Sequence, residues 1–472
     1  MKQVPKWRLV AAGAAIALVA AACGSSSTPT SSGGTTTTAA SGGTNTASAP
    51  GITATTITVG SHQPLTGPAA PGYSEIAPAA NAFFQYVNSK GGVYGRTINY
   101  TYEDDGYNPA NTATLTRKLV LQNNIFADVG SLGTPTQSAV QSFLNQQKVP
   151  QLFIESGCNC WNDSKFPLSL GWQPPYTVDG KILGAYIKAN FAGKKIGYLY
   201  QSDEFGQDVV KGLDMEIPSS SVVSRQSYDV ATLAGPLSNQ MSALKAAGAQ
   251  VVVLATIPAA TALAMLPAAV ATYFPQYVID AVGADPPTVG PLLESFAQKG
   301  GATASQVAAA AGLLNGVISN TYLPPENQTS NPWIQDTQKL LQQYAPSLWA
   351  KSGLDGNTEY GVALGYTFVQ ALQKAGKNLT RQSLLNAINT QGKHFVGPGL
   401  VPFAYSSSNH FGYEGDQIVK LETSAPPAVT PTGSWIGGVT VGPVYVTSPG
   451  KGPLTKYTGT PSTPPKSFSS IA

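Results

Sequence analysis

The sequence predicts an α/β fold with two parallel sheets. From residue 52 to about residue 424, short apolar runs alternate with longer segments in which apolar residues recur at helical spacing. Such alternation is typical of parallel sheets that carry helices on both faces. It pauses at Trp172–Pro175 and then restarts, which indicates two lobes with a crossing between them. A chain of 472 residues is long enough for two domains with cores of their own.

The first series of elements is bounded by turn and cap residues. Gly91–Gly92 ends the first long helix, and Asn108–Pro109 supplies an N-cap followed by proline at the first helical position. We predict strands at Ile57–Gly60, Ile98–Tyr102, Ile125–Val129 and Gln151–Ile154. The helices between them are predicted at Ile76–Val87, Pro109–Gln122 and Thr134–Gln147.

The second series repeats the alternation, beginning with a helix. Its predicted helices cover Val178–Phe191, Phe205–Met215, Leu237–Ala247 and Ala259–Ala271. Its predicted strands are Ile196–Tyr200, Val222–Tyr228, Val251–Ala255 and Tyr277–Asp280. Because a helix again separates each pair of strands, the same parallel architecture is expected.

After the second series the chain is expected to cross back twice. A crossing near Ile318–Pro325 would lead to first-lobe helices at Trp333–Tyr344 and Glu359–Ala375, and a third crossing follows Gly397–Gly399. The predicted segments are residues 52–175 and 319–396 for the first lobe and residues 176–318 and 397–424 for the second. The Pro/Thr/Gly-rich tail, residues 425–472, is expected to be mostly weakly ordered, although Val439–Val446 could form a strand.

An export signal precedes the fold. Three basic residues within positions 2–8 are followed by an apolar run, Leu9–Ala22, that ends at Cys23. A basic head, a short apolar core and small residues before a cleavage point make a signal peptide, and the run is shorter than the ~20 residues that span a bilayer. We therefore predict a signal peptide at residues 1–22.

Cys23 is the predicted site of lipid attachment. It directly follows three alanines and resembles the lipidated cysteine of a bacterial lipobox, with the usual leucine displaced to Leu18. The alternative is an ordinary secretory signal with an incidental cysteine. Residues 24–50 carry no charge and nothing large to bury, so they cannot offset the entropy of ordering. We predict that residues 23–50 form a lipidated, disordered tether.

Composition excludes several classes of protein. The formal net charge is only +3, and no basic stripe suggests a nucleic-acid partner. Besides Cys23, the only cysteines are Cys158 and Cys160, which is too few for a disulfide framework. No later segment is long and apolar enough to cross a membrane.

Short motifs occur in a fixed order along residues 52–419. They are Pro64–Pro68, Val87–Arg96, Tyr102–Asp105, Thr134–Ala139, Ser202–Gly206 and Val396–Pro398 followed by Phe411–Gly412. In this order, and behind an export signal, they resemble the type I periplasmic binding proteins of the branched-chain amino acid (leucine-binding) kind, the solute receptors of ABC importers. The resemblance implies two Rossmann-like lobes joined by three hinge strands, with a small-molecule ligand in the cleft between them.

The resemblance also implies a role. The chain would be a monomeric receptor without a cofactor, anchored to the outer face of the bacterial cytoplasmic membrane, that performs no chemistry and docks a membrane permease. Its solute would be small and would bear a carboxylate or an amide, like a branched-chain amino acid. One alternative is a sensory receptor of the same fold that signals through a partner. Another is an exported enzyme, and a third is a receptor for amine-free aromatic or aliphatic acids.

Two loops are candidates for holding a ligand carboxylate. In doubly wound sheets the ligand lies off the carboxyl ends of the strands, where helix N-termini attract anions. The loops Gly130–Thr134 and Glu155–Cys158 follow two predicted strands. By position, the resemblance assigns these contacts to Gly133, Thr134, Ser156 and Cys158. The alternative for Thr134 is a plain N-cap, and one hydroxyl could serve both roles.

Aromatic and polar residues are expected to complete the cleft. Tyr73 and Phe205 match family positions whose rings close over the ligand, and the alternative is packing on their own helices. We favour the cleft, because burying a ring on closure is a large favourable term. Thr256 and Ile257 follow a predicted strand and also face the expected cleft, with loop packing as the alternative.

The acid that pairs the ligand ammonium in amino-acid receptors is missing from its expected position, which holds Ala281. Asp280 or Asp285 could replace it. A carboxylate in a closed cleft without a cation is costly, so its presence should track the charge of the ligand. Both an amino acid and an amine-free acid therefore remain open as ligands.

No pattern predicts catalysis or metal binding. Cys158 and Cys160 are expected to form a tight local disulfide or to remain two quiet thiols. A nucleophilic cysteine would need a nearby base. Of the three histidines, only His62 lies in a loop that could line the cleft, and the cysteines and histidines lack zinc-ligand spacing. We predict no catalytic residue and no metal site.

Overall fold

The computed structural model describes residues 45–447, 452–461 and 468. The predicted signal peptide, Cys23 and most of the predicted tether lie outside the described residues. Within the described ranges, none of the helices combines the length and the apolar character that crossing a membrane requires.

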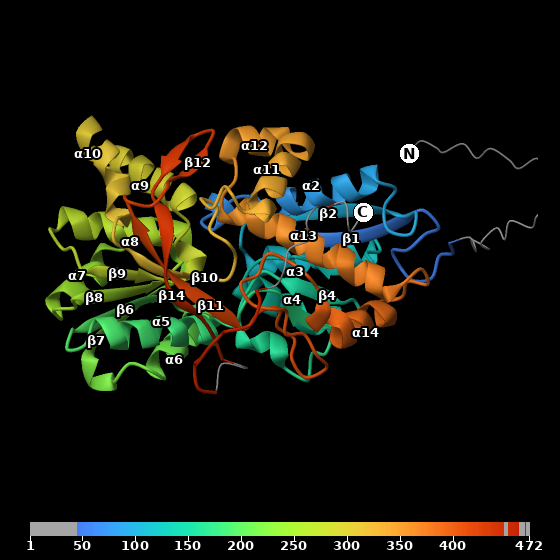
Figure 1. Ribbon diagram of the computed structural model, residues 1–472, viewed down its shortest axis with the longest axis horizontal. Coiled ribbons are helices and arrows are strands. Elements are labelled where there is room, and N and C mark those ends of the chain that lie inside the picture. Colours follow the sequence, from blue (N-terminus) through green and yellow to red (C-terminus); the bar gives the residue numbers. More distant parts are fainter. Residues whose placement is uncertain (1–44, 448–451, 462–467, 469–472) are drawn as a thin grey trace, which may run out of the picture. The chain divides into compact units, whose positions relative to one another are not determined.

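The first lobe is built on a five-stranded sheet in the order β2-β1-β3-β4-β5, with every pair parallel (Figure 1). Its strands are β1 (Thr56–Gln63), β2 (Thr97–Asp104), β3 (Asp128–Val129), β4 (Gln151–Ile154) and β5 (Ser169–Gly171). Its early helices are α1 (Ala70–Tyr73), α2 (Ile76–Ser89), α3 (Pro109–Leu121) and α4 (Thr134–Gln146). Later helices join them: α11 (Pro332–Tyr344), α12 (Pro346–Ser352), α13 (Gly356–Ala375) and α14 (Arg381–Gln391). Because α11 and α13 pack against α2, these late helices belong to the first lobe.

The second lobe is built on an eight-stranded sheet in the order β15-β14-β11-β10-β9-β8-β6-β7. Its parallel strands are β6 (Ile196–Gln201), β7 (Val222–Tyr228), β8 (Val251–Ala255), β9 (Gln276–Ile279) and β10 (Ile318–Thr321). The antiparallel strands are β11 (Gly415–Glu422), β14 (Gly437–Val446) and β15 (Thr455–Lys456). Its helices are α5 (Tyr176–Asn190), α6 (Glu204–Asp214), α7 (Ser238–Ala246), α8 (Pro258–Val270), α9 (Pro286–Lys299) and α10 (Ala304–Ala310). The predicted fold class, α/β with two lobes, is confirmed.

Helix starts follow local capping chemistry. The side chain of Asn108 accepts a hydrogen bond from the N–H of Ala110 at 2.9 Å and caps α3, as the sequence predicted. Asp203 caps α6 by accepting from the N–H of Phe205 at 3.1 Å. Asp355 and Thr358 form a reciprocal capping box at the start of α13. These caps fix the positions at which helices begin beside the strand ends.

The tail differs most from its prediction. Residues 425–447 were expected to be mostly weakly ordered, but β12 (Ala428–Thr430) pairs with β13 (Gly433–Trp435), and β14 pairs with β11 along its whole length. Without β14, the strand β11 would be an open sheet edge with unpaired backbone groups, which proteins avoid. Elsewhere, β3 is shorter than the predicted strand, and α9 and α10 were not predicted.

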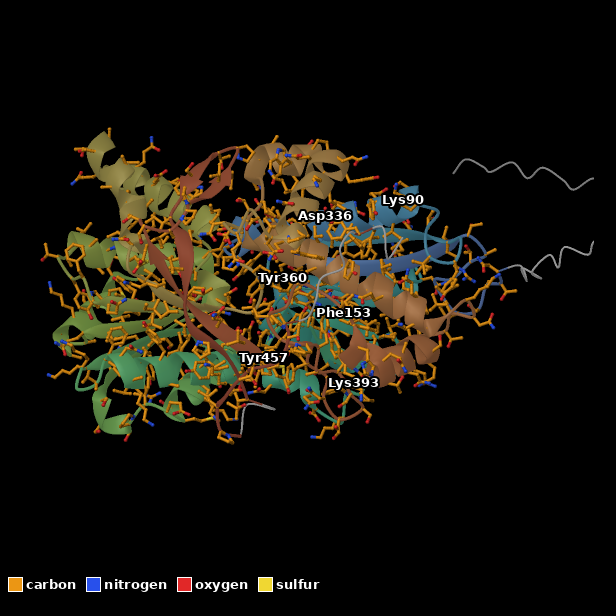
Figure 2. All side chains as sticks on the ribbon, in the orientation of Figure 1. Lys90, Phe153, Asp336, Tyr360, Lys393 and Tyr457 are labelled. Carbon is orange, nitrogen blue, oxygen red and sulfur yellow. A yellow bond between two sulfur atoms is a disulfide. The ribbon has the colours of Figure 1, made fainter. Side chains whose placement is uncertain are left out.

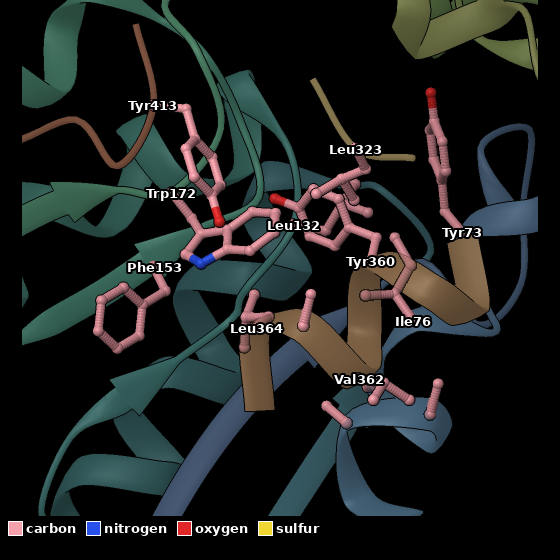
Figure 3. Packing of buried hydrophobic residues seen from close by; sticks show 14 of the residues in the cluster. Tyr73, Ile76, Leu132, Phe153, Trp172, Leu323, Tyr360, Val362, Leu364 and Tyr413 are labelled. Atoms are coloured by element: carbon pink, nitrogen blue, oxygen red, sulfur yellow. The ribbon is translucent and has the colours of Figure 1, made fainter. Parts of the chain in front are cut away.

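The three connections between the sheets meet at Trp172. Its ring contacts Tyr322, which follows β10, and Tyr413, which precedes β11, in edge-on arrangements with centroids 6.2 and 5.3 Å apart. The indole N–H donates to the hydroxyl of Thr367 on α13 at 3.0 Å. Figure 3 shows Trp172 packed beside Tyr413 and Phe153 in this cluster. Trp172 is fully buried, so it is a structural residue of the junction.

Candidate functional site

A cavity of about 190 Å³ opens between elements of the two lobes. Its walls come from the ends of β4, β9 and β10 and from the starts of α5, α9 and α13. Six aromatic side chains line it: Tyr73, Tyr107, Tyr176, Phe205, Tyr322 and Tyr360. Tyr360 projects from α13, and Figure 3 shows it beside Leu323, another lining residue (Figures 2 and 3). A concave site with apolar walls and a few convergent polar groups is the usual form of a small-molecule site.

Three of the predicted contact residues line this cavity, namely Tyr73, Gly133 and Phe205. The ring of Phe205 packs against that of Tyr176 with centroids 4.7 Å apart, so the two rings form one wall. Ile257, Ala281 and Asp285, which the sequence placed near the cleft, line the cavity as well.

Tyr73 connects the two lobes. It ends α1 in the first lobe, and its hydroxyl donates a hydrogen bond to the carbonyl oxygen of Val282 at 2.7 Å. Val282 lies in the short helical turn Ala281–Gly283 that follows β9 in the second lobe. The bond therefore closes one side of the cavity with a contact that a more open arrangement of the lobes would break.

Asp285 makes a second connection. Its side chain caps α9 by accepting from the N–H and hydroxyl of Thr288, at 3.1 and 2.6 Å. The same carboxyl accepts from the N–H of Gly356, at the start of α13, at 3.2 Å. Burial raises the pKa of Asp285 to about 6, although the hydrogen bonds from Thr288 and Gly356 oppose that change. The N-termini of two helices from different lobes thus meet at one carboxyl group.

The predicted carboxylate loops are differently arranged. Thr134 and Ser156 are buried and do not line the cavity, and their hydroxyls are 2.7 Å apart in a hydrogen bond with each other. Ser156 also accepts from the N–H of Cys158 at 3.2 Å. The alternative role of Thr134 as an N-cap is wrong, because Gly133 occupies the N-cap of α4 and Thr134 is its first helical residue.

Cys158 and Cys160 form a disulfide, which was one of the two expected states. Cys158 is buried and does not line the cavity. The bridge holds the short helical turn Asn159–Asn162, which follows β4. At the start of this turn the N–H of Cys160 donates a hydrogen bond to the sulfur of Cys158 at 3.2 Å.

Thr256 and Asp280 lie behind the cavity wall. The hydroxyl of Thr256 bonds that of Thr261 at 2.6 Å, and one carboxyl oxygen of Asp280 accepts from the N–H of Val282 at 3.1 Å. Burial raises the pKa of Asp280 to about 7, and Asp416 adds to the effect. Neither side chain is among the residues lining the cavity.

His62, which was expected in a loop that could line the cleft, lies in β1 and does not line the cavity. It is fully buried with its ring nitrogens 3.4 Å from Asp105 and 3.6 Å from Asp128. Burial alone would lower the pKa of His62, but the carboxyl groups of Asp128 and Asp105 outweigh it and raise the pKa to about 9. The ring crosslinks the ends of the first-lobe strands and is structural.

Five carboxyl side chains line the cavity: Glu155, Asp179, Asp285, Glu326 and Glu359. Of these, sequence reasoning named only Asp285 as a candidate and missed the other four. Asp179 and Glu359 lie in the first turns of α5 and α13, where acidic residues are common for reasons of helix dipole alone, so the sequence carried no distinct signal. Within the described part of the chain, no group of three or more metal-binding side chains is arranged to hold a metal ion.

A family model described as periplasmic binding protein matches residues 56–424. The chain belongs to the periplasmic binding protein family. The resemblance that the sequence motifs carried, to type I members of the leucine-binding kind, is confirmed. Membership implies a place outside the cytoplasm. A search among curated protein sequences finds no match.

Solved structures share the fold. A fatty acid ABC transporter substrate-binding protein from Thermomonospora curvata has a TM-score of 0.70 at 22% identity, over 85% of this chain and 95% of its own. A branched-chain amino acid ABC transporter protein from Thermus thermophilus, solved with bound valine, has a TM-score of 0.66 at 17% identity, over 84% and 98%. A type 1 periplasmic binding protein from Bordetella pertussis has a TM-score of 0.65 at 16% identity, over 82% and 100%. This chain shares the two-lobed fold of these neighbours.

Proposed function

We propose that this chain is the solute receptor of an ABC importer, which traps a small molecule between its lobes and presents it to a membrane permease. The observation that carries the proposal is a cavity lined from both lobes and closed by the hydrogen bond from Tyr73 to Val282. A solute that touches both lobes favours the closed arrangement by its preference for that state. Family membership and the similarity to transporter-associated binding proteins support this role.

The solute we propose is amino-acid-like, with a carboxylate or amide and an ammonium group. Gly133 offers a site beside the N-terminus of α4 for the anionic or amide end. The alternative of an amine-free acid is less favourable, because the residues lining the cavity include five carboxyl side chains and no Lys, Arg or His. A second anion in a closed site without a cation would be costly.

The remaining features of the proposal concern location and partners. An export signal, lipid attachment at Cys23 and a tether would place a monomeric receptor at the outer face of the cytoplasmic membrane, within reach of its permease. The chain would perform no chemistry. A sensory receptor with the same fold is the second candidate, and it would differ in its partner rather than in its cavity.

A thermal-shift screen of the full chain tests the proposal. The panel would contain Leu, Ile, Val, Phe, short amides and carboxylates without an amine, and a solute at 100 times its dissociation constant stabilises by about 2.7 kcal/mol. We expect a shift that Tyr73→Ala abolishes, with the solute recovered unchanged. Turnover of the solute, or a shift that Tyr73→Ala leaves intact, would contradict the proposal.

A further inference from the structure

The acidic side chains of the cavity are incompletely partnered. Asp179 and Glu359 are each 1% exposed and Glu155 is 6% exposed. One carboxyl oxygen of each makes no hydrogen bond of good geometry, although the side chain of Trp333 lies near Glu359 and that of Asp416 lies near Asp179. Buried polar atoms in native proteins are nearly always paired, so these three oxygens can accept further hydrogen bonds from a ligand in the cavity.

The helix N-termini around the cavity are already supplied with negative groups. Asp179 lies in the first turn of α5, Glu359 lies in the first turn of α13, and Asp285 is the N-cap of α9. A helix N-terminus attracts an anion through its free N–H groups and its dipole, but here the chain's own carboxyl groups take that place. Three of the positions where a ligand anion would otherwise bind are therefore unfavourable for it.

The carboxyl groups also raise each other's proton affinity. Burial, and then the charge of Asp285, raise the pKa of Glu326 to about 7. Burial, and then Glu326, hold the pKa of Glu359 well above its usual range. Glu326 and Glu359 line the same cavity, and a positive charge placed between them would favour the ionised form of both.

The rings around these groups fit the same kind of ligand. Tyr322 and Tyr360 line the same cavity, where Asp179 lies near Tyr322 and Glu155 lies near Tyr360; Tyr360 is buried and Tyr322 is half-buried. The face of an aromatic ring attracts a cation, and the attraction is strongest in a site from which water is excluded. Because the cavity lining contains carboxyl groups and rings but no Lys, Arg or His, this part of the cavity favours a cation over an anion.

We propose that the solute carries a net positive charge and that a basic amine or quaternary ammonium group of it binds at Glu359 and Glu326, in the cavity that Tyr322 and Tyr360 also line. The inference rests on the proposed receptor function and narrows its ligand. An aliphatic amino acid has only one ammonium group, which its own carboxylate balances. A cationic solute leaves a positive charge for the acidic wall.

To test this proposal, calorimetry and thermal shift would measure how tightly the full polypeptide binds five probes whose carbon chains are similar. The probes are lysine, norleucine, 1,5-diaminopentane, 1-aminopentane and hexanoate. We expect lysine or an amine-only probe to bind more tightly than norleucine, and hexanoate not to bind. Glu359→Gln should weaken the amines at least about ten-fold, because a hydrogen bond to a charged group is lost, while unliganded stability stays equal or rises. Asp336→Asn, which changes a half-buried carboxyl on α11 that is not among the residues lining the cavity, is the matched control.

The dependence of amine affinity on pH provides an independent test. A bound cation requires ionised carboxyl groups, so amine affinity should increase from pH 5.5 to pH 8 and binding should release protons. Tighter binding of norleucine or hexanoate than of the amines, no amine binding at all, or equal amine affinity in Glu359→Gln would each overturn the cation site. Should an uncharged or anionic solute bind and be lost in Tyr73→Ala, the cation site fails while the receptor function stands. Absence of any binding from this panel and the earlier one would count against both.

Discussion

The hydroxyl of Tyr73 donates a 2.7 Å hydrogen bond to the carbonyl oxygen of Val282, and this bond joins the first lobe to the second beside the cavity. Both residues line the cavity, so a solute that binds there lies next to the contact. Closure of the lobes and capture of the solute are therefore coupled through one side chain, which is a polar group at the edge of an aromatic wall.

Removing this hydroxyl should weaken binding without destroying the wall. Tyr73→Phe keeps the ring and deletes the bond between the lobes. A hydrogen bond contributes about 0.5–1.5 kcal/mol net, so we expect solute affinity to decrease about 2- to 12-fold. Calorimetry with the solute found in the screen measures the change.

A second tyrosine provides the control for this substitution. Tyr273 makes the same kind of bond, from its hydroxyl to the carbonyl oxygen of Ala249 at 2.7 Å, but both residues belong to the second lobe. Tyr273→Phe should lower the free energy of unfolding by the contribution of one hydrogen bond, about 0.5–1.5 kcal/mol, and should leave solute affinity unchanged. Equal effects of the two substitutions on affinity would refute the coupling between closure and capture.

The buried His62 should make stability depend on pH. Its pKa in the folded protein, about 9, lies above the ordinary value of 6.5, so the folded state favours the protonated ring. The stabilisation is complete below pH 6.5 and is lost as the pH rises through 9, and it amounts to on the order of 3 kcal/mol. Denaturant unfolding of the wild type and His62→Gln between pH 6 and pH 9.5 should show this difference shrinking with pH.

A control variant separates the effect of His62 on stability from the effects of other titrating groups. His394 is exposed, and His394→Gln is the control for replacing a histidine by glutamine elsewhere in the chain. If the difference between wild type and His62→Gln stays constant over the same range, the ring is neutral in the folded protein and the ion pairs with Asp105 and Asp128 are not formed.

Thr134 and Ser156 should contribute to stability as one unit. Their hydroxyls bond to each other at 2.7 Å and neither lines the cavity. Thr134→Ala and Ser156→Ala should each lower the free energy of unfolding by about 1–3 kcal/mol, because each removes the buried hydrogen bond between the two hydroxyls, and Ser156→Ala also removes the acceptor of the Cys158 N–H. The double variant should cost little more than Ser156→Ala alone. Two outcomes would instead indicate that these hydroxyls contact the ligand directly. One is that the losses of unfolding free energy in the two single variants add up in the double variant, and the other is a loss of solute affinity that exceeds the loss of stability.

The alternation of strands and helices was predictable because it is a local property. Strands β6 and β8 are continuous apolar runs with polar neighbours, and the structure has them within a residue of the predicted ends. The strand β14 was only partly foreseen, since its order depends on pairing with β11 and not on its own composition. The helix α9 begins with Pro286 and Pro287 and contains Pro291, and three prolines obscure the helical periodicity of the sequence.

The site residues were predictable only where they match sequence motifs of the family. Tyr73, Gly133 and Phe205 follow strand ends in the order that the family resemblance supplies, and all three line the cavity. Asp179 and Glu359 come from helices that are far apart in the sequence, and only the three connections around Trp172 bring them to one cavity. A first-turn acid looks the same whether it faces solvent or a ligand.

Gly133 should be sensitive to any side chain. It has φ of 109°, and an added Cβ would lie 2.5 Å from the Thr136 hydroxyl and 2.6 Å from the ring of Tyr107, which also lines the cavity. Gly91 has a similar φ of 101° with nothing within 4 Å of an added Cβ, so it is a matched control. Both alanine variants carry the strain of a positive φ, roughly 1–2 kcal/mol. Only Gly133→Ala should also displace Tyr107 and lower solute affinity. Unfolding and calorimetry on the pair separate the two effects, and equal affinity in both variants would remove Gly133 and Tyr107 from the binding wall.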